Sequence, residues 1–366
     1  MKKHIVIDAR ESGTSTGTYI DKLVSYLHQL NPPYSITILA KPHRREFFEE
    51  LAPKFSVKVT RFKEFTFAEQ LGLLKQIKSL NPDLVFFPAA QQPILYRGKV
   101  VTTIQDLTTV RFRNPTKNWL IFTIKRWVYI WVNKIVARKS AALITPSEFV
   151  KEDFAKFAKV NSRKFTVTYE AADPISEKPE PLDDLIDKEF IMYVGRPQPH
   201  KNLERLIDAF AIVKKSRPGL ILVLVGKKDA AYKNLSRYAL RQSIDDIIFT
   251  GWVSEGQKRW LYEHTSAYVF PSLSEGFGLP PLEAMTHGAP VVSSNATCLP
   301  EISQDAALYF DPTSTDDMAE AVKKVLDSKS LRQSLIKKGH AQVKKYSWRR
   351  MAQQTLDVFR EVLEED

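Results

Sequence analysis

The chain has 366 residues, enough for two α/β domains, and its 43% hydrophobic and 26% charged content is ordinary for a folded protein. The single cysteine, Cys298, excludes a disulfide framework and a cysteine-based metal centre. The net charge is +12, and no run reaches the roughly 18 apolar residues that a membrane span needs. The start, MKKHIVIDARESG, has too short an apolar run for a signal peptide, so we expect a first β-strand there. The lone cysteine fits a reducing compartment, and we expect a cytoplasmic protein.

Strand-like and helical segments alternate along the first half of the chain. The predicted strands read HIVIDA, SITILA, DLVFFP, VVTTIQD and AALITPS. Predicted helices cover Tyr19–Leu30, Arg44–Leu51 and Glu148–Phe157, and a long helical stretch follows Asp106. Strand, helix and strand at this spacing predict a parallel sheet with helices on both faces.

A linker separates this half from a second one. Residues 173–189 (DPISEKPEPLDDLIDKE) combine three prolines and seven acids with few apolar residues. Alternation then restarts with the apolar strands FIMYVG, LILVLVG, IIFTG, AYVFPS and APVVSS, as expected for buried parallel strands. We expect helices between them at Leu203–Lys215, Lys233–Gln242, Glu255–His264 and Leu282–Gly288.

The alternation therefore predicts two doubly wound, Rossmann-like domains. The first covers residues 1–175 and the second residues 176–348. Ligands of open α/β sheets bind at the carboxyl ends of the strands. We expect the two domains to face each other across a cleft formed by those ends.

The strongest motif is YVFPSLSEGFGLPPLEAM. After the strand, a loop with Glu275 leads into a helix whose first turn holds Pro280 and Pro281, so the free amides at its start come from Phe277, Gly278 and Leu279. Such amides form an anion site. We place Glu283, eight positions after Glu275, in the first helical turn. The two acids suit sugar and ribose hydroxyls; the alternative is that Glu283 caps its own helix and Glu275 is solvated.

Two further segments carry candidate ligand-binding residues. In MYVGRPQPHKN, Arg196 and Lys201 flank a turn at a strand's carboxyl end, where they could neutralise a diphosphate; the alternative is two solvated cations. The early turn from Ser12 to Tyr19 is rich in small residues, which let a backbone approach a ligand closely, although such turns are common.

Together these segments resemble glycosyltransferase family 4, the retaining, group 1 type glycosyltransferases of GT-B fold. VGRPQPHKN resembles the family's Gly-Arg…Lys-Asn segment, and SEGFGLPPLEAM resembles its paired-Glu motif. TIQDLTTVRF and ITPSEFVKEDF resemble its first-domain segments. YSWRRMAQQTL resembles the C-terminal helix, here residues 349–366, that crosses back to the first domain in this fold.

The resemblance implies roles for the residues that match. Arg196 and Lys201 would hold the donor diphosphate, and Glu275 would hold donor-sugar hydroxyls. Glu283 would take the ribose hydroxyls, and Val253 would lie against the base. The remaining donor contacts would come from backbone, namely Gly17 of the first domain and Phe277, Gly278 and Leu279 of the second.

One position departs from the family. Where the family often has His before Asp, this chain has Gln105 before Asp106, and glutamine can hydrogen-bond but cannot exchange a proton. We expect this pair to position the sugar or the acceptor. The resemblance implies no metal and no cofactor besides the nucleotide sugar, and no Asp-x-Asp loop argues for a metal.

The resemblance implies a retaining transfer of a hexose, with a lean toward mannose, from a GDP- or UDP-linked donor to a glycan or lipid-linked acceptor. The diphosphate would take the acceptor proton while Arg196 and Lys201 neutralise it. A sugar-nucleotide epimerase or hydrolase of the same fold, and a non-catalytic nucleotide-sugar binding protein, are the alternatives.

The basic excess lies in the first half. Residues 1–175 hold 28 Lys+Arg and 15 Asp+Glu, against 26 and 27 in the rest. No nucleic-acid-binding motif accompanies it. Within it, the segment Lys117–Lys139 places eight apolar residues on one helical face: Leu120, Ile121, Ile124, Trp127, Val128, Trp131, Val132 and Ile135. We expect a core helix; the alternative is an interfacial helix on an anionic membrane, which would make the protein peripheral to the inner membrane face.

Overall fold

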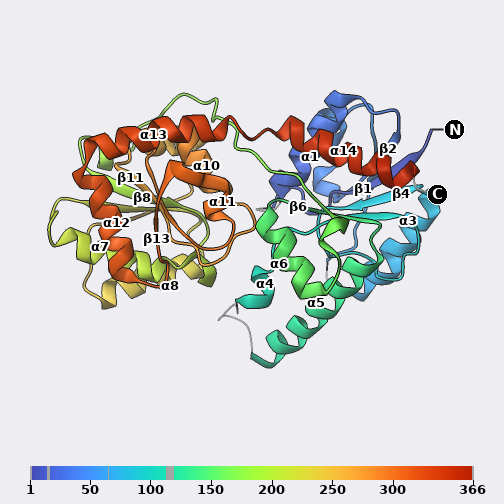
Figure 1. Cartoon of the computed structure of the whole chain (residues 1–366), viewed down its shortest axis with the longest axis horizontal. Helices are drawn as coiled ribbons and strands as arrows, with labels where there is room; N and C mark the ends of the chain where they lie inside the picture. Colours follow the sequence, from blue (N-terminus) through green and yellow to red (C-terminus); the bar gives the residue numbers. More distant parts are fainter. Residues whose placement is uncertain (1, 15–16, 65, 113–118, 365–366) are drawn as a thin grey trace. The chain divides into compact units, whose positions relative to one another are not determined.

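Two separate parallel sheets organise the chain in the computed structural model, which describes residues 2–14, 17–64, 66–112 and 119–364 (Figure 1). The chain divides into two units. The first unit comprises Met1–Val110, Trp119–Glu170 and Ser347–Asp366, and the second comprises Arg111–Asn118 and Ala171–Tyr346. The α/β architecture predicted from the sequence is confirmed.

The first unit is built on a seven-stranded sheet in the order β3-β2-β1-β4-β5-β6-β7. Every pairing is parallel, so all the carboxyl ends lie at one edge. The central strands are buried on both faces because their sequences are apolar throughout, as in the LVFF of β4. The strands are β1 (His4–Asp8), β2 (Ser35–Ala40), β3 (Ser56–Val59), β4 (Leu84–Phe87), β5 (Val100–Thr103), β6 (Ala142–Thr145) and β7 (Phe165–Val167).

Helices cover both faces of this sheet. The C-terminal helix α14 belongs to this unit, where it lies against α1 and stacks Phe359 on Phe86 at 5.2 Å between ring centroids. Short 3-10 turns occupy 42–44 and 162–164, and a π-helical turn at 69–73 leads into α3. The helices are α1 (Gly17–Leu30), α2 (Arg45–Leu51), α3 (Leu74–Leu80), α4 (Thr108–Arg111), α5 (Trp119–Lys139), α6 (Glu148–Ala158) and α14 (Trp348–Glu364).

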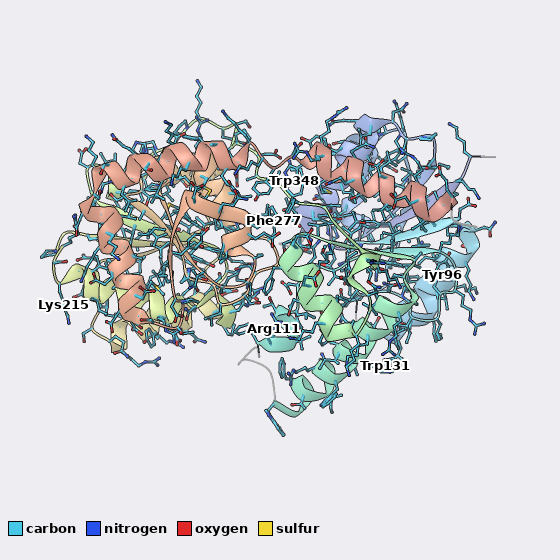
Figure 2. The ribbon with its side chains drawn as sticks, in the orientation of Figure 1. Tyr96, Arg111, Trp131, Lys215, Phe277 and Trp348 are labelled. Carbon is cyan, nitrogen blue, oxygen red and sulfur yellow. The ribbon has the colours of Figure 1, made fainter. Side chains whose placement is uncertain are left out.

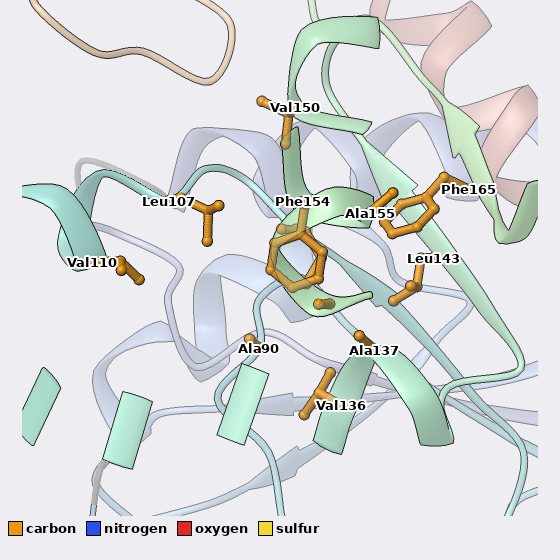
Figure 3. Close-up of a cluster of buried hydrophobic side chains, with 12 residues drawn as sticks. Ala90, Leu107, Val110, Val136, Ala137, Leu143, Val150, Phe154, Ala155 and Phe165 are labelled. Atoms are coloured by element: carbon orange, nitrogen blue, oxygen red, sulfur yellow. The ribbon is translucent and has the colours of Figure 1, made fainter. Parts of the chain in front are cut away.

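A buried cluster joins α5 and α6 to the sheet (Figure 3). Phe154 of α6 packs beside Phe165 of β7, with ring centroids 6.1 Å apart. From α5, Val136 and Ala137 enter the same cluster. Helix α6 begins sharply because the Ser147 hydroxyl accepts a hydrogen bond from the Val150 amide.

The second unit has a six-stranded sheet in the order β10-β9-β8-β11-β12-β13, again parallel throughout. Its strands are β8 (Phe190–Val194), β9 (Ile221–Val225), β10 (Ile247–Gly251), β11 (Ala267–Phe270), β12 (Val291–Ser294) and β13 (Ala307–Phe310). Its helices are α7 (Leu203–Lys214), α8 (Ala230–Arg241), α9 (Glu255–His264), α10 (Leu279–Thr286), α11 (Leu299–Ser303), α12 (Thr315–Asp327) and α13 (Lys329–Val343), with 3-10 turns at 183–185, 199–201 and 304–306.

The sequence did not assign some of these elements. Edge strands β3 and β7 are short, and β3 alternates exposed and half-buried residues, so neither carries the long apolar run of a central strand. The predicted Leu282–Gly288 helix begins three residues earlier, because Pro280 and Pro281 occupy its first turn. Ser15, Thr16, Lys117, Asn118, Glu365 and Asp366, which fall within predicted segments, lie outside the described residues.

The expectation that the Lys117–Lys139 helix is simply core is wrong for one of its faces. Helix α5 buries Asn133, Val136 and Ala137, while Trp127 and Trp131 on the opposite side are exposed. Periodicity identifies an apolar face but does not say whether that face is the one that packs. None of the helices in the described ranges is both long and apolar enough to cross a bilayer.

Candidate active site

The loops that follow β8 and β11 meet at the carboxyl edge of the second unit's sheet, because these two strands are neighbours. The Leu273 amide donates a hydrogen bond to the His200 carbonyl at 2.7 Å. The Asn202 side-chain amide donates to the Pro271 carbonyl at 3.1 Å. Two motifs about seventy residues apart are thereby held together.

Lys201 and Glu275 form an ion pair between these loops. The Lys201 ammonium lies 2.6 Å from a Glu275 carboxylate oxygen, and both side chains are largely shielded from water. The ammonium also lies 5.5 Å from the centroid of the Phe270 ring. Beside it, burial and the Lys201 charge lower the pKa of His200 to about 4, so this imidazole is neutral at physiological pH. The edge thus offers a cation for phosphate next to a carboxylate for hydroxyls.

Arg196 lies on the neighbouring loop and pairs with Asp229. One Asp229 carboxylate oxygen lies 3.1 Å from the Arg196 guanidinium, while the other accepts hydrogen bonds from the Ala231 and Tyr232 amides at the start of α8. The Tyr232 hydroxyl donates to the Gly195 carbonyl, which fixes the loop before Arg196. Asp229 was not singled out in the sequence analysis. It could have been found as an acidic residue between a predicted apolar strand and the helix after it, a position typical of a helix N-cap.

The start of α10 requires glycine. Gly278 precedes the helix with φ of 93°, in the left-handed region, and a β-carbon there would lie 2.7 Å from a methyl carbon of Leu299. The Phe277 side chain is buried, edge-on to Tyr346 at 5.6 Å between ring centroids. Leu279 is the first helical residue. The contribution of these residues to a ligand therefore rests on their backbone.

Glu283 does not lie in the first turn of α10, as the sequence suggested, but one turn in, since the helix begins at Leu279. The Tyr262 hydroxyl donates a long hydrogen bond to its carboxylate at 3.4 Å. Burial raises the pKa of Glu283, and the Lys258 charge opposes that rise. Its contact with ribose stays a prediction.

Val253 follows β10, an edge strand of the same sheet, and is half-buried. Its neighbour Trp252 is exposed. The next residue, Ser254, caps α9 through a reciprocal pair of hydrogen bonds with Gln257. The segment is thus held in place from its C-terminal side, and the contact of Val253 with a base stays a prediction.

Gly17, Gln105 and Asp106 belong to the first unit, at the carboxyl edge of its own sheet. A β-carbon on Gly17 would lie 2.4 Å from the Glu11 carbonyl oxygen, so this position accepts glycine alone. The Asp106 carboxylate accepts a hydrogen bond from the Thr108 amide at 2.8 Å and so caps α4. Gln105 is half-buried beside it.

The same edge of the first unit holds a buried charged cluster that sequence reasoning missed. Arg10 donates hydrogen bonds to both carboxylate oxygens of Asp8 and lies 2.8 Å from Glu69. Burial alone would lower the pKa of Arg10, but the two carboxylates raise it. The signal was the Asp-x-Arg pattern at the end of the first strand. The cluster holds the loop after β1 to the turn that precedes α3.

Within the described residues, no three His, Cys, Asp or Glu side chains gather into a set that could hold a metal ion. The reaction's independence of metal stays a prediction.

Two such sheets, each with candidate site residues at its carboxyl edge, define a two-domain α/β protein of GT-B fold. Solved structures agree on the fold: sucrose-phosphate synthase from Thermosynechococcus elongatus matches with a TM-score of 0.79 at 17% identity, and both chains are covered in full. Anabaena HepE, in complex with UDP and glucose, matches with a TM-score of 0.74 at 16% identity over 98% of this chain and 100% of that one. At these identities the likeness shows the fold alone.

The family models extend this result to the sequence. Residues 16–175 match the model described as Glycosyltransferase Family 4, and residues 176–342 match the one described as Glycosyl transferases group 1. The chain therefore belongs to the group 1 glycosyltransferases of family 4, and the resemblance seen in its motifs is confirmed.

Several curated relatives carry mannosyltransferase names. O-antigen chain mannosyltransferase B of Escherichia coli is 34% identical over 173 residues, which are 47% of this chain and 45% of the relative. O-antigen chain mannosyltransferase RfbU of Salmonella typhimurium is 25% identical over 86% of this chain and 88% of its own length. The chain spans less than half the length of the first of these relatives.

Proposed function

We propose that this protein transfers a mannosyl group from a nucleotide-diphosphate sugar to a glycan or lipid-linked acceptor, with retention of the anomeric configuration and without a metal. The observation that carries the proposal is the Lys201–Glu275 pair, 2.6 Å apart at the carboxyl edge of the second unit's sheet. It sets a phosphate-binding cation beside a hydroxyl-binding carboxylate, as a nucleotide sugar requires.

In the proposed reaction the bond between the anomeric carbon and the diphosphate breaks, and the acceptor oxygen bonds to that carbon from the same face. The diphosphate takes the acceptor proton, so no protein nucleophile is needed. Arg196, Lys201 and the amides of Phe277, Gly278 and Leu279 neutralise the leaving group. The other contacts are assigned to Glu275 on the sugar, Glu283 on ribose, Val253 on the base and Gly17 on the diphosphate, with Gln105 and Asp106 on the sugar or acceptor.

The names of the relatives support mannose as the transferred sugar. Two bases remain candidates for the donor. The mannosyltransferase names of the relatives favour GDP-mannose, whereas the structural neighbour HepE was solved with UDP. Family membership favours a transferase over an epimerase or hydrolase of the same fold.

The O-antigen relatives also support a polysaccharide or lipid-linked acceptor. We propose that the protein works in the cytoplasm, peripheral to the inner membrane face, where such an acceptor would be presented. The basic excess of residues 1–175 supports an anionic surface as its partner.

The test is a donor panel of GDP-mannose, UDP-glucose, UDP-galactose and dTDP-glucose with synthetic mannosyl and lipid-diphosphate acceptors. We expect transfer from GDP-mannose, an axial linkage by NMR that matches the donor, and full activity in EDTA. Lys215→Ala, an exposed site in the same unit, is the control for Lys201→Ala. An inverted product, or activity lost in EDTA and restored by one divalent ion, would contradict the proposal.

A further inference from the structure

Helix α5 turns an apolar stripe away from the core of the first unit. Ile124, Trp127, Val128 and Trp131 fall on one face at helical spacing, and their exposed fractions are 58, 67, 54 and 56%. Trp131 marks the stripe at the periphery of this unit (Figure 2). The opposite face of the helix fills the buried cluster of Figure 3. The stripe is therefore additional to what α5 needs for folding.

Clustered exposure of this kind is uncommon on a monomer. Along the described sequence outside α5, large exposed hydrophobic residues occur singly or in pairs, as at Phe67 with Leu71, or at Trp252. Contiguous apolar patches mark interaction sites, whereas scattered ones do not. The four residues of the stripe therefore indicate an interaction site.

The charge around the stripe identifies the kind of occupant. Helix α5 contains five Lys and Arg residues and no acid, and Lys125 and Arg138 are exposed beside the stripe. Residues 119–164, which add α6 and the following turn, hold ten Lys+Arg and three Asp+Glu. Lys139, by contrast, turns inward, where it donates to the Pro93 carbonyl and burial lowers its pKa to about 8. The exposed charge is one-sided, which an anionic partner complements.

We infer that the α5 stripe docks on an anionic lipid surface, with Trp127 and Trp131 among the acyl chains and Lys125 and Arg138 on the headgroups. Tryptophan beside lysine and arginine on a non-spanning helix is the composition of interfacial helices. Protein–protein interfaces are depleted of lysine, so the exposed Lys125 beside the stripe favours a lipid surface over a protein partner. This inference rests on the proposed function, in which the acceptor lies at a membrane, but it is tested by vesicle binding and not by enzymatic activity.

The first test compares two double variants in sedimentation with vesicles of phosphatidylglycerol and phosphatidylcholine. Trp127→Ser with Trp131→Ser is expected to lower the partition coefficient at least tenfold. Phe67→Ser with Leu71→Ser removes two apolar side chains of the same unit that lie outside α5 and are, as a pair, more exposed than the tryptophans, and it should change the partition coefficient less than twofold. Thermal melting of each variant, alone and with GDP or UDP, verifies that the fold and the donor site are intact.

The second test concerns charge. Each cation near an anionic surface contributes about fivefold to binding. Lys125→Glu with Arg138→Glu should therefore lower binding to phosphatidylglycerol vesicles more than tenfold, and added salt should weaken the wild type. Lys215→Glu, a single charge reversal at an exposed site of the second unit, is the control for position and should bind like wild type. Brominated lipid should quench Trp127 and Trp131.

Three results would overturn the inference. They are no binding to anionic vesicles at low salt, unchanged binding of the tryptophan double variant, and a wild-type dimer that this variant converts to a monomer. The last would assign the stripe to a second copy of the chain. Failure of transfer with normal vesicle binding would instead sink the proposed function and leave the docking surface standing.

Discussion

The Lys201 ammonium and the Glu275 carboxylate, 74 positions apart in the chain, lie 2.6 Å from one another. Their strands β8 and β11 are neighbours in a parallel sheet, so the loops that follow them leave the sheet side by side. The pair is shielded but not fully buried. A donor diphosphate would compete with Glu275 for the ammonium, and a sugar hydroxyl would then donate to the released carboxylate.

We expect Lys201→Ala to reduce transfer at least tenfold and Arg196→Ala to do the same. Loss of one charge-assisted contact to a departing diphosphate costs about 2 to 4 kcal/mol in the transition state. Steady-state kinetics with the donor varied checks this. Arg196 is mostly exposed, so its variant should melt like wild type, and near-normal turnover in both variants would refute the assignment.

Asp229 restrains Arg196 in the absence of donor, and its charge can be removed without removing the helix cap. Asp229→Asn keeps an oxygen for the Ala231 and Tyr232 amides, and we expect it to lower the donor KM two- to fivefold, on the order of 0.5 to 1 kcal/mol for an exposed ion pair. Asp229→Ala should in addition lose about 1 kcal/mol of stability with the cap. A raised KM in the asparagine variant would show that Asp229 itself assists the donor.

Arg10 neutralises two buried carboxylates, so its removal should be costly. Arg10→Met leaves Asp8 and Glu69 buried without their cation and should lower the free energy of unfolding by about 3 to 5 kcal/mol. Adding Asp8→Asn and Glu69→Gln should restore part of it. Urea unfolding measures both. Arg45→Met, which breaks an exposed pair with Glu49, is the control and should unfold at nearly the same urea concentration as wild type.

Burial raises the pKa of Glu170 to about 8. Between its ordinary value near 4.5 and 8 the folded state holds a proton that the unfolded state has lost, so the free energy of unfolding should fall as pH rises across that window. Glu170→Gln should remove this dependence and be more stable than wild type at pH 8 by about 2 to 4 kcal/mol, at about 1.4 kcal/mol per pKa unit.

Thermal unfolding from pH 4.5 to 8.5 measures this difference. Glu361→Gln, an exposed acid of the same unit, should track wild type at every pH. A Glu170→Gln curve parallel to wild type would mean that Glu170 is ionised in the folded protein.

The sequence by itself determined the architecture and the family. Apolar runs such as FIMYVG and LILVLVG can be satisfied only as strands buried on both faces, and Pro280, Pro281 and Gly278 specify where α10 begins. These are local constraints of chain geometry and burial. They were sufficient to predict two α/β domains and to point at Arg196, Lys201 and Glu275.

Tertiary structure alone decided which of these groups meet. Strand order joins Lys201 to Glu275 and Arg196 to Asp229, and no spacing in the chain encodes that order. Tertiary structure also decided which face of α5 is buried. Periodicity gave the helix an apolar face, but the cluster around Phe154 took the side with Val136 and Ala137, so Trp127 and Trp131 were left exposed. The sequence pattern shows which residues share a helical face, but only the neighbouring elements determine which face is buried.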